Sequence, residues 1–297
     1  MRFAFALVLF WPIGCAKAPP VFTAAGAFQA VKHGESPGIH NLVRVNDWLY
    51  SGSEPEAESG FRTLHALGIR TVISVDGTKP DLARAGIFGI RYVHMPIGYN
   101  AIPQERVLQI AKAMQSLPRP IYLHCHHGKH RGPAAAMAGL RCLDPRWTAA
   151  EGVRYLELAG TASEYSELFA SVERQSPLEP GVLDRISPDF PEVAEIPDLV
   201  GKMLELDELM GRLKKSHSQE RPVNPQDAVA LREAYRELQR DSGTKPEEFR
   251  RLLDVGENNS DGLIRSGLSL SQKNAFAISE STCVECHQKF RNRTSGK

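Results

Sequence analysis

One short stretch of the chain concentrates residue types that can do chemistry. Residues 124–131 read His-Cys-His-His-Gly-Lys-His-Arg, directly after an apolar run and directly before a run of small residues typical of a helix. A loop at a helix N-terminus directs backbone N–H groups and the positive end of the helix dipole at one point, which favours anions. Gly128 lets such a loop close tightly, and Arg131 can turn back to bind two phosphate oxygens. The stretch predicts an oxyanion site.

The same field should stabilise the thiolate of Cys125 and make it a nucleophile. We therefore expect Cys125 and Arg131 to be the catalytic residues, and His124 to orient the loop through a hydrogen bond. The loop residues expected to bind phosphate are His126, His127, Gly128, Lys129, His130 and Arg131. The alternatives are a chance cluster of these residue types or a metal site.

A second stretch has the pattern Cys-x-x-Cys-His, at residues 283–287. Two thiols three residues apart can add to the two vinyl groups of one porphyrin, while the adjacent histidine binds the iron. The pattern predicts one covalent haem c, with Cys283 and Cys286 as attachment points and His287 as iron ligand. The alternatives are a zinc site or a redox dithiol. Zinc would need two more Cys or His ligands, and residues 218–297 contain none besides the motif itself.

The first fifteen residues have the pattern of a signal peptide. Arg2 precedes an unbroken apolar run, Phe3 to Trp11, which is too short to span a bilayer. The run ends in Pro-Ile-Gly-Cys, which resembles a bacterial lipoprotein cleavage box with Cys15 as the lipidated residue, although Pro12 departs from the usual Leu. Ordinary cleavage and an uncleaved anchor are the alternatives. We expect a periplasmic or other extracytoplasmic protein that touches a membrane only through a lipid on Cys15.

Composition and charge limit the classes of partner. The chain has 297 residues, 42% hydrophobic and 24% charged, with a net charge of +1. These values are ordinary for soluble protein, and the length allows about two domains. Because the net charge is near zero, we expect no nucleic-acid partner.

The elements divide the chain into two domains. Residues 16–38 read as a tether, and residues 39–175 alternate strands (43–50, 70–75, 91–96 and 120–123) with helices (59–67, 104–117, 132–143, 148–158 and 164–173), an α/β pattern. Residues 176–192 are rich in proline and are expected to be a linker. Residues 193–297 show helical periodicity at 196–213, 225–241, 247–253 and 271–291, which predicts an all-α four-helix bundle.

The first domain resembles a known enzyme superfamily. His-Cys-x-x-Gly-x-x-Arg after a strand, together with residues 49–53 and 68–73, resembles the protein tyrosine and dual-specificity phosphatases over about residues 40–175. The resemblance implies a central sheet with flanking helices and hydrolysis of a phosphate monoester through a phosphocysteine at Cys125, with Arg131 clamping the phosphate.

Two departures from the family pattern concern turnover. Gly132 stands where the family has Ser or Thr, and residues 96–105 contain no Asp to act as general acid. Asn100 in that stretch is no useful proton donor, so the acid would have to be Asp76, Asp81 or Glu105. Because a general acid contributes roughly 10²- to 10⁴-fold, oxyanion binding without fast turnover is an alternative.

The second domain resembles the cytochrome c′ and c556 family over about residues 190–297. The haem motif lies in the last of four helices and is followed by Gln-Lys-Phe-Arg. The resemblance implies a sixth iron site that faces the first helix, for which Met203 is the candidate and Met210 the second choice. It also implies a redox partner protein and a homodimer through the bundle.

Three functions follow from these observations. The first is an exported phosphatase whose haem domain supplies redox or gas-linked control or electron transfer. The second is an oxyanion sensor coupled to a cytochrome, and the third is a plain electron carrier.

Overall fold

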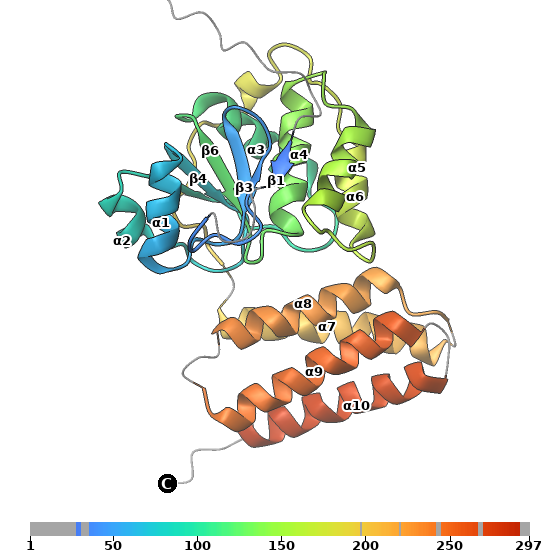
Figure 1. Ribbon diagram of the computed structural model, residues 1–297. Helices are drawn as coiled ribbons and strands as arrows, with labels where there is room; N and C mark the ends of the chain where they lie inside the picture. The colour runs from blue at the N-terminus through green and yellow to red at the C-terminus, as the bar shows by residue number, and fades with distance from the viewer. Residues whose placement is uncertain are drawn as a thin grey trace, which may run out of the picture.

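The computed structural model describes residues 28–30, 36–196, 198–219, 221–241, 245–266 and 270–291. The predicted signal peptide, Cys15 and most of the predicted tether lie outside these ranges. The described residues form an α/β part followed by a helical part (Figure 1), which confirms the predicted fold class.

The α/β part is built on one six-stranded sheet of order β1-β2-β3-β6-β4-β5. The pairs β3–β6, β6–β4 and β4–β5 are parallel, whereas β1–β2 and β2–β3 are antiparallel. Strand β1 lies within the segment predicted as a tether, so the end of that segment belongs to the sheet. The strands are β1 Gln29–Ala30, β2 Val43–Arg44, β3 Leu49–Gly52, β4 Thr71–Ser74, β5 Arg91–His94 and β6 Ile121–His124.

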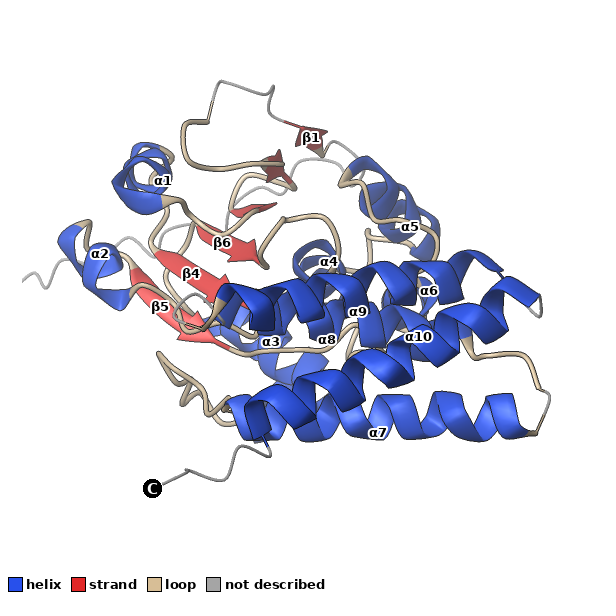
Figure 2. Cartoon of the chain, turned by 90° about the horizontal axis from the view of Figure 1, so that it is seen from below, coloured by secondary structure: helices blue, strands red, loops and turns tan. Residues whose placement is uncertain are grey.

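Helices cover both faces of this sheet (Figure 2). They are α1 Ala57–Ala66, α2 Leu82–Ile87, α3 Gln104–Ser116, α4 Arg131–Leu143, α5 Ala149–Leu158 and α6 Ser166–Glu173. Helix α4 is buried along nearly its whole length because its small residues let it pack between the sheet and neighbouring helices. Only α2 was not predicted; the side chain of Asp81 caps its N-terminus.

The proline-rich segment packs on the α/β part. Leu183 and Phe190 are buried in the main core. The N–H of His94, the last residue of β5, donates to the carbonyl of Pro191 over 2.8 Å. Proline blocks regular structure but not burial, so the segment predicted as a linker covers the edge of the sheet.

The helical part contains α7 Leu199–Ser218, α8 Pro225–Asp241, α9 Glu247–Ser266 and α10 Leu270–Cys286, with a π-helix at His287–Arg291. Helix α9 runs well past residue 253, where the prediction ended it. The reason is tertiary packing: Gly256 lies against the ring of Tyr235, where a Cβ atom would be 2.3 Å from the ring. Within the described ranges, no helix combines the length and apolar character needed to cross a bilayer.

Candidate functional site

Cys125 directly follows β6, and β6 lies between strands β3 and β4 in the sheet. The carboxyl ends of parallel strands meet at one edge of the sheet, where α/β proteins bind ligands. The loop from Cys125 to His130 then leads into α4, which begins at Arg131. Cys125 is buried, with 2% of its surface exposed.

The loop carbonyls turn outward. The carbonyl of His126 accepts from the N–H of Glu54 (2.9 Å), that of Gly128 from the side chain of Asn41 (2.8 Å), and that of Lys129 from the hydroxyl of Thr161 (2.5 Å). Because a trans peptide is planar, each following N–H points the opposite way. The amides of residues 127, 129 and 130 therefore turn inward, as an anion-binding nest requires.

Two glycines are fixed by close approach. Gly128 has a φ of +69°, and a Cβ atom there would lie 2.2 Å from the carbonyl carbon of Gly52. A Cβ atom at Gly132 would lie 2.9 Å from the backbone nitrogen of Cys125. Position 132 therefore has no room for the Ser or Thr of the phosphatase pattern.

The guanidinium of Arg131 is 1% exposed and lies among acidic groups. It donates to Asp76 (2.9 Å), to Glu237 of α8 (2.6 Å) and to the carbonyl of Ile97 (3.3 Å). The guanidinium carbon, Cζ, lies 4.2 Å from the ring centre of Tyr99. The Nε atom is buried without a hydrogen-bond partner among the described residues. A buried donor without a partner is costly, so Nε is available to a ligand oxygen.

Asp76 holds Arg131 in place and cannot act as an acid. Burial alone would raise its pKa, but Arg131 and Arg240 outweigh burial and hold that pKa well below its usual range. Both carboxylate oxygens accept from Arg240, over 3.2 and 2.5 Å. The other two substitutes for the missing acid have other roles: Asp81 caps α2, and Glu105 lies in the first turn of α3.

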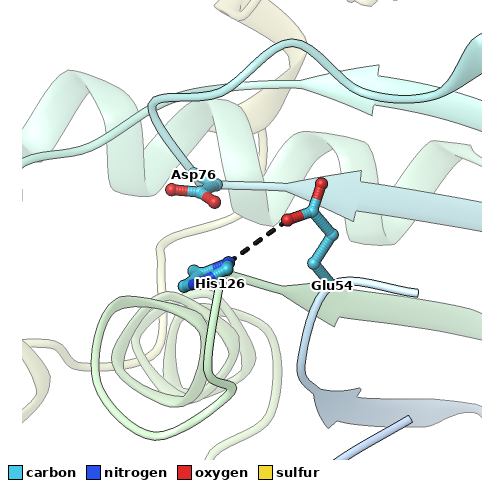
Figure 3. A group of neighbouring side chains, drawn as sticks. All are labelled: Glu54, Asp76 and His126. Carbon is cyan, nitrogen blue, oxygen red and sulfur yellow. Dashed lines mark hydrogen bonds and ion pairs between the residues drawn. The ribbon is translucent and has the colours of Figure 1, made fainter. Parts of the chain in front are cut away.

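Glu54, Asp76 and His126 gather with ligand atoms within 4.8 Å of one another (Figure 3). His126 Nδ1 pairs with Glu54 over 3.3 Å, which lowers the pKa of Glu54. Because two guanidinium groups already bind Asp76, a cation there would meet positive charge. Within the group, Asp76 supports Arg131, and His126 pairs with Glu54.

The loop histidines point in different directions. His124 pairs with the hydroxyl of Tyr92 (2.7 Å) and with the carbonyl of Cys125 (3.3 Å), and burial lowers its pKa. The ring of His130 contacts Tyr165, with centroids 4.2 Å apart and the ring planes tilted by 31°. The side chains of His126, His127 and Lys129 line a groove of about 830 Å³ that Arg131 does not line. These three residues therefore line a different pocket from the one that Arg131 lines.

A cavity of about 260 Å³ lies between the α/β part and the helical part. Residues 96–100 and Arg131 line one wall, and α7 and α8 contribute Lys202, Glu205, Glu233 and Glu237. The sequence did not indicate that the helical part forms a wall of this site.

The Cys-x-x-Cys-His motif lies at the end of α10, where the π-helix begins at His287. Two adjoining pockets, the larger about 570 Å³, share Met203, Asp207, Cys286 and His287. Cys283 lines the smaller pocket, and its sulfur lies 3.5 Å from the hydroxyl of Tyr235. Burial raises the pKa of both thiols. Met210 lies in the bundle core and lines neither pocket.

These residues fit a porphyrin. Cys286, His287 and Met203 of α7 line a largely apolar pocket, and Cys283 lines the smaller pocket that adjoins it. Among the described residues, the one group of three or more close metal-ligating side chains is that of Glu54, so no additional ligands gather at Cys283 as zinc would require.

No family model matches the sequence, and neither does any curated protein. Several of the similar solved structures are named as phosphatases or putative phosphatases. TpbA of P. aeruginosa is 20% identical, covering 48% of this chain and 91% of its own, with a TM-score of 0.40. The catalytic domain of the S. cerevisiae PP-IP phosphatase SIW14, in complex with citrate, is 19% identical, covering 50% and 90%, with a TM-score of 0.41. The N-terminal half of the chain resembles these tyrosine and PP-IP phosphatase-like domains.

Proposed function

We propose that the chain hydrolyses a phosphate monoester through a phosphocysteine at Cys125, and that its helical part carries a covalent haem. The observation that carries the first claim is the site of Arg131. A buried guanidinium with a free Nε stands beside a loop whose amides turn inward around a buried cysteine. Such groups stabilise the transition state of phosphoryl transfer, in which the negative charge spreads over three oxygens.

The reaction begins when the phosphoryl group enters the nest and one oxygen binds Arg131 Nε. The Cys125 thiolate attacks phosphorus, a sulfur–phosphorus bond forms and the ester bond breaks. Water then hydrolyses the phosphocysteine and regenerates the thiolate. Asp76 keeps the guanidinium in position throughout.

Hydrolysis of an aryl phosphate by the full-length protein tests this proposal. We expect Cys125→Ser to lower kcat by about 10³-fold or more, because a hydroxyl replaces the nucleophile. The matched control is Cys142→Ser, at another buried cysteine whose sulfur lies 3.6 Å from Gln175; it should keep most of the activity. Equal activity in Cys125→Ser and wild type would remove the proposal.

A second function, oxyanion sensing without turnover, is favoured by Gly132 and by the lack of a carboxyl group at 96–104. It predicts binding of inorganic phosphate without hydrolysis, measured by titration calorimetry, and loss of that binding in Arg131→Ala.

For the helical part we propose thioether bonds from Cys283 and Cys286 to one haem c, His287 as its iron ligand and Met203 as the sixth-site residue. The group would supply redox or gas-binding chemistry, for control of the phosphatase or for exchange of electrons with a partner protein. Supporting this are the shared pocket residues and the apolar lining. Because c-type haem is attached outside the cytoplasm, the proposal includes export.

The visible absorption spectrum of protein made in a maturation-competent host tests the haem proposal, and Met203→Ala tests the sixth site. A colourless wild-type protein would contradict it. A Met203→Ala spectrum identical to that of wild type would remove Met203 as a ligand.

A further inference from the structure

Cleavage of a phosphate monoester releases an oxyanion, and a positioned acid accelerates that step by protonating it. The stretch that lines the cavity beside Arg131, residues 96–100, contains no carboxyl group. The proton donor must therefore come from elsewhere in the structure.

Most carboxyl groups around Arg131 are held in their charged form. Asp76 is bound by two guanidinium groups. Glu233, which is 4% exposed, accepts hydrogen bonds from Tyr165, Arg232 and Arg236, and the guanidinium groups outweigh its burial and lower its pKa. Neither group is suited to donate a proton.

Glu237 is placed differently. One of its oxygens lies 2.6 Å from Arg131 Nη1, the nitrogen that also binds the Ile97 carbonyl. Its other oxygen fills a niche at Gly77, where a Cβ atom would lie 2.9 Å away. Its side chain is 23% exposed and lines the cavity. The carboxyl group thus contacts the guanidinium and lines the same cavity as Arg131.

Helix α8 is held on both sides of Glu237. One turn before it, Glu233 accepts from Tyr165 over 2.7 Å, and about one turn after it, Arg240 binds Asp76 and Thr78. These positions share one face of the helix. A reacting group needs this kind of rigid support.

We infer that Glu237 is the general acid of the phosphatase site, supplied by the helical part. The inference rests on the proposed phosphatase function. A phosphoryl group bound at Arg131 Nε places negative charge beside Glu237, and negative charge beside a carboxyl favours its protonated form.

The step balances as follows. The Cys125 sulfur forms its bond to phosphorus, the ester oxygen leaves with the bonding electron pair, and the proton of Glu237 moves to that oxygen to give the alcohol or phenol. In the second half, the Glu237 carboxylate takes a proton from water as the water oxygen bonds to phosphorus. The Cys125 thiolate and phosphate are released, and Glu237 is again protonated.

The test compares Glu237→Gln with Asp227→Asn, which removes a carboxylate from the same helix where it pairs with Arg212, away from the site. Both variants are assayed on p-nitrophenyl phosphate, whose leaving group needs little protonation, and on phenyl phosphate, whose leaving group needs more. For Glu237→Gln we expect kcat on phenyl phosphate to fall about 10²-fold or more, a smaller fall on p-nitrophenyl phosphate, and loss of the alkaline decline in kcat. Competitive inhibition by inorganic phosphate should tighten, because a carboxylate no longer occupies Arg131. Asp227→Asn should match wild type.

An unchanged or raised kcat on phenyl phosphate in Glu237→Gln would overturn the inference and leave the contact as a gate over Arg131. Absence of any Cys125-dependent turnover in wild type would instead remove the proposed function and the inference together. If Glu237→Gln fails to fold, Glu237→Asp replaces it. That variant keeps the proton on a shorter chain, so it should retain the alkaline decline at a lower kcat, and loss of that decline would contradict the inference.

Discussion

The α/β part and the helical part fill their interiors in different ways. Around β6 and α4 the core residues are almost fully buried by other residues of the chain. In the helical part, Leu204 is 61% exposed and Leu199 36% exposed, and both line the pocket of about 570 Å³ beside the haem motif. The helical part also has a packed core, but beside the haem motif it leaves an apolar pocket that Cys286 and His287 line. This pocket supports the haem proposed for the helical part.

Removing both thiols should have the largest effect, because it should change the stability of the helical part and leave that of the α/β part unchanged. We expect Cys283→Ala/Cys286→Ala to lose covalent haem and to destabilise the helical part by about 5 kcal/mol relative to the haem-loaded protein, the scale of a large core cavity. The α/β part should unfold as in wild type. Absorption and calorimetric unfolding measure both effects, with Cys142→Ala as control in the other part. Equal unfolding of the double variant and wild type would contradict the contrast.

The ion pairs of Asp76 with Arg131 and with Arg240 of α8 join the α/β part to the helical part, and we call them the junction. Asp76→Asn should break it. Asp76 is the buried partner of Arg131 and Arg240, and removal of one member of a buried ion pair costs about 3 to 5 kcal/mol. The same variant should lose phosphate binding because Arg131 is no longer held. Chemical unfolding measures the cost, and Asp47→Asn, in a surface pair with Arg44, should cost less than about 1 kcal/mol. A small effect at Asp76 would mean that the junction carries little stability.

The pH dependence of the same contact has a definite sign. The pKa of Asp76 is depressed in the folded state by Arg131 and Arg240. Its contribution is therefore complete above the unfolded-state value of about 3.9 and is lost as pH falls below it.

Periodicity and motifs predicted most of the elements because their signals are local. The apolar strands and the small-residue helix α4 follow directly from the sequence, and β6–loop–α4 sets the position of Cys125. What could not be predicted depends on contacts distant in sequence. Helix α9 passes through a Gly-Glu-Asn-Asn stretch because Gly256 packs on Tyr235, and no local pattern reveals that packing.

The same limit applies to the candidate site. The loop itself identified Cys125 and Arg131 as candidates, but Glu237 lies 106 residues from Arg131. One signal was present: Glu233, Glu237 and Arg240 lie on one face of a predicted helix and leave that face charged. Only the structure shows that this face meets Arg131 and Asp76.

Gly132→Ser tests how tightly the α/β part is packed. It restores the hydroxyl of the phosphatase pattern, yet its Cβ atom would meet the Cys125 nitrogen at 2.9 Å. We expect a loss of about 1 to 3 kcal/mol in unfolding free energy and no gain in kcat. The matched control is Gly86→Ser in α2, where nothing lies within 4 Å of the added atom, and its stability should be unchanged or slightly raised. A higher kcat with unchanged stability would show that the loop backbone can shift to accept the added Cβ atom.

The smallest effect concerns His130, which links the loop to the helical part. Its ring packs at a tilt against Tyr165, which donates to Glu233 of α8. Burial lowers the pKa of His130 to about 4; Glu233 opposes that shift, and His127, Arg131 and Arg232 reinforce it. The unfolded histidine takes up a proton near pH 6.5, whereas the folded one stays neutral until about pH 4. Stability should therefore fall as pH decreases through this window.

Unfolding free energies of wild type and His130→Gln between pH 7 and pH 4 test this sign. Because burial also lowers the pKa of His94, His124 and His127, both proteins should lose stability on acidification. Only the difference between the two curves belongs to His130, and it should change by at most about 1.4 kcal/mol per pH unit. His40→Gln, at an exposed histidine paired with Glu56, should follow the wild-type curve. Parallel curves for wild type and His130→Gln would mean that this ring can accept a proton without disturbing the junction. The contact between the α/β part and the helical part would then depend on Arg131, Asp76 and their α8 partners alone.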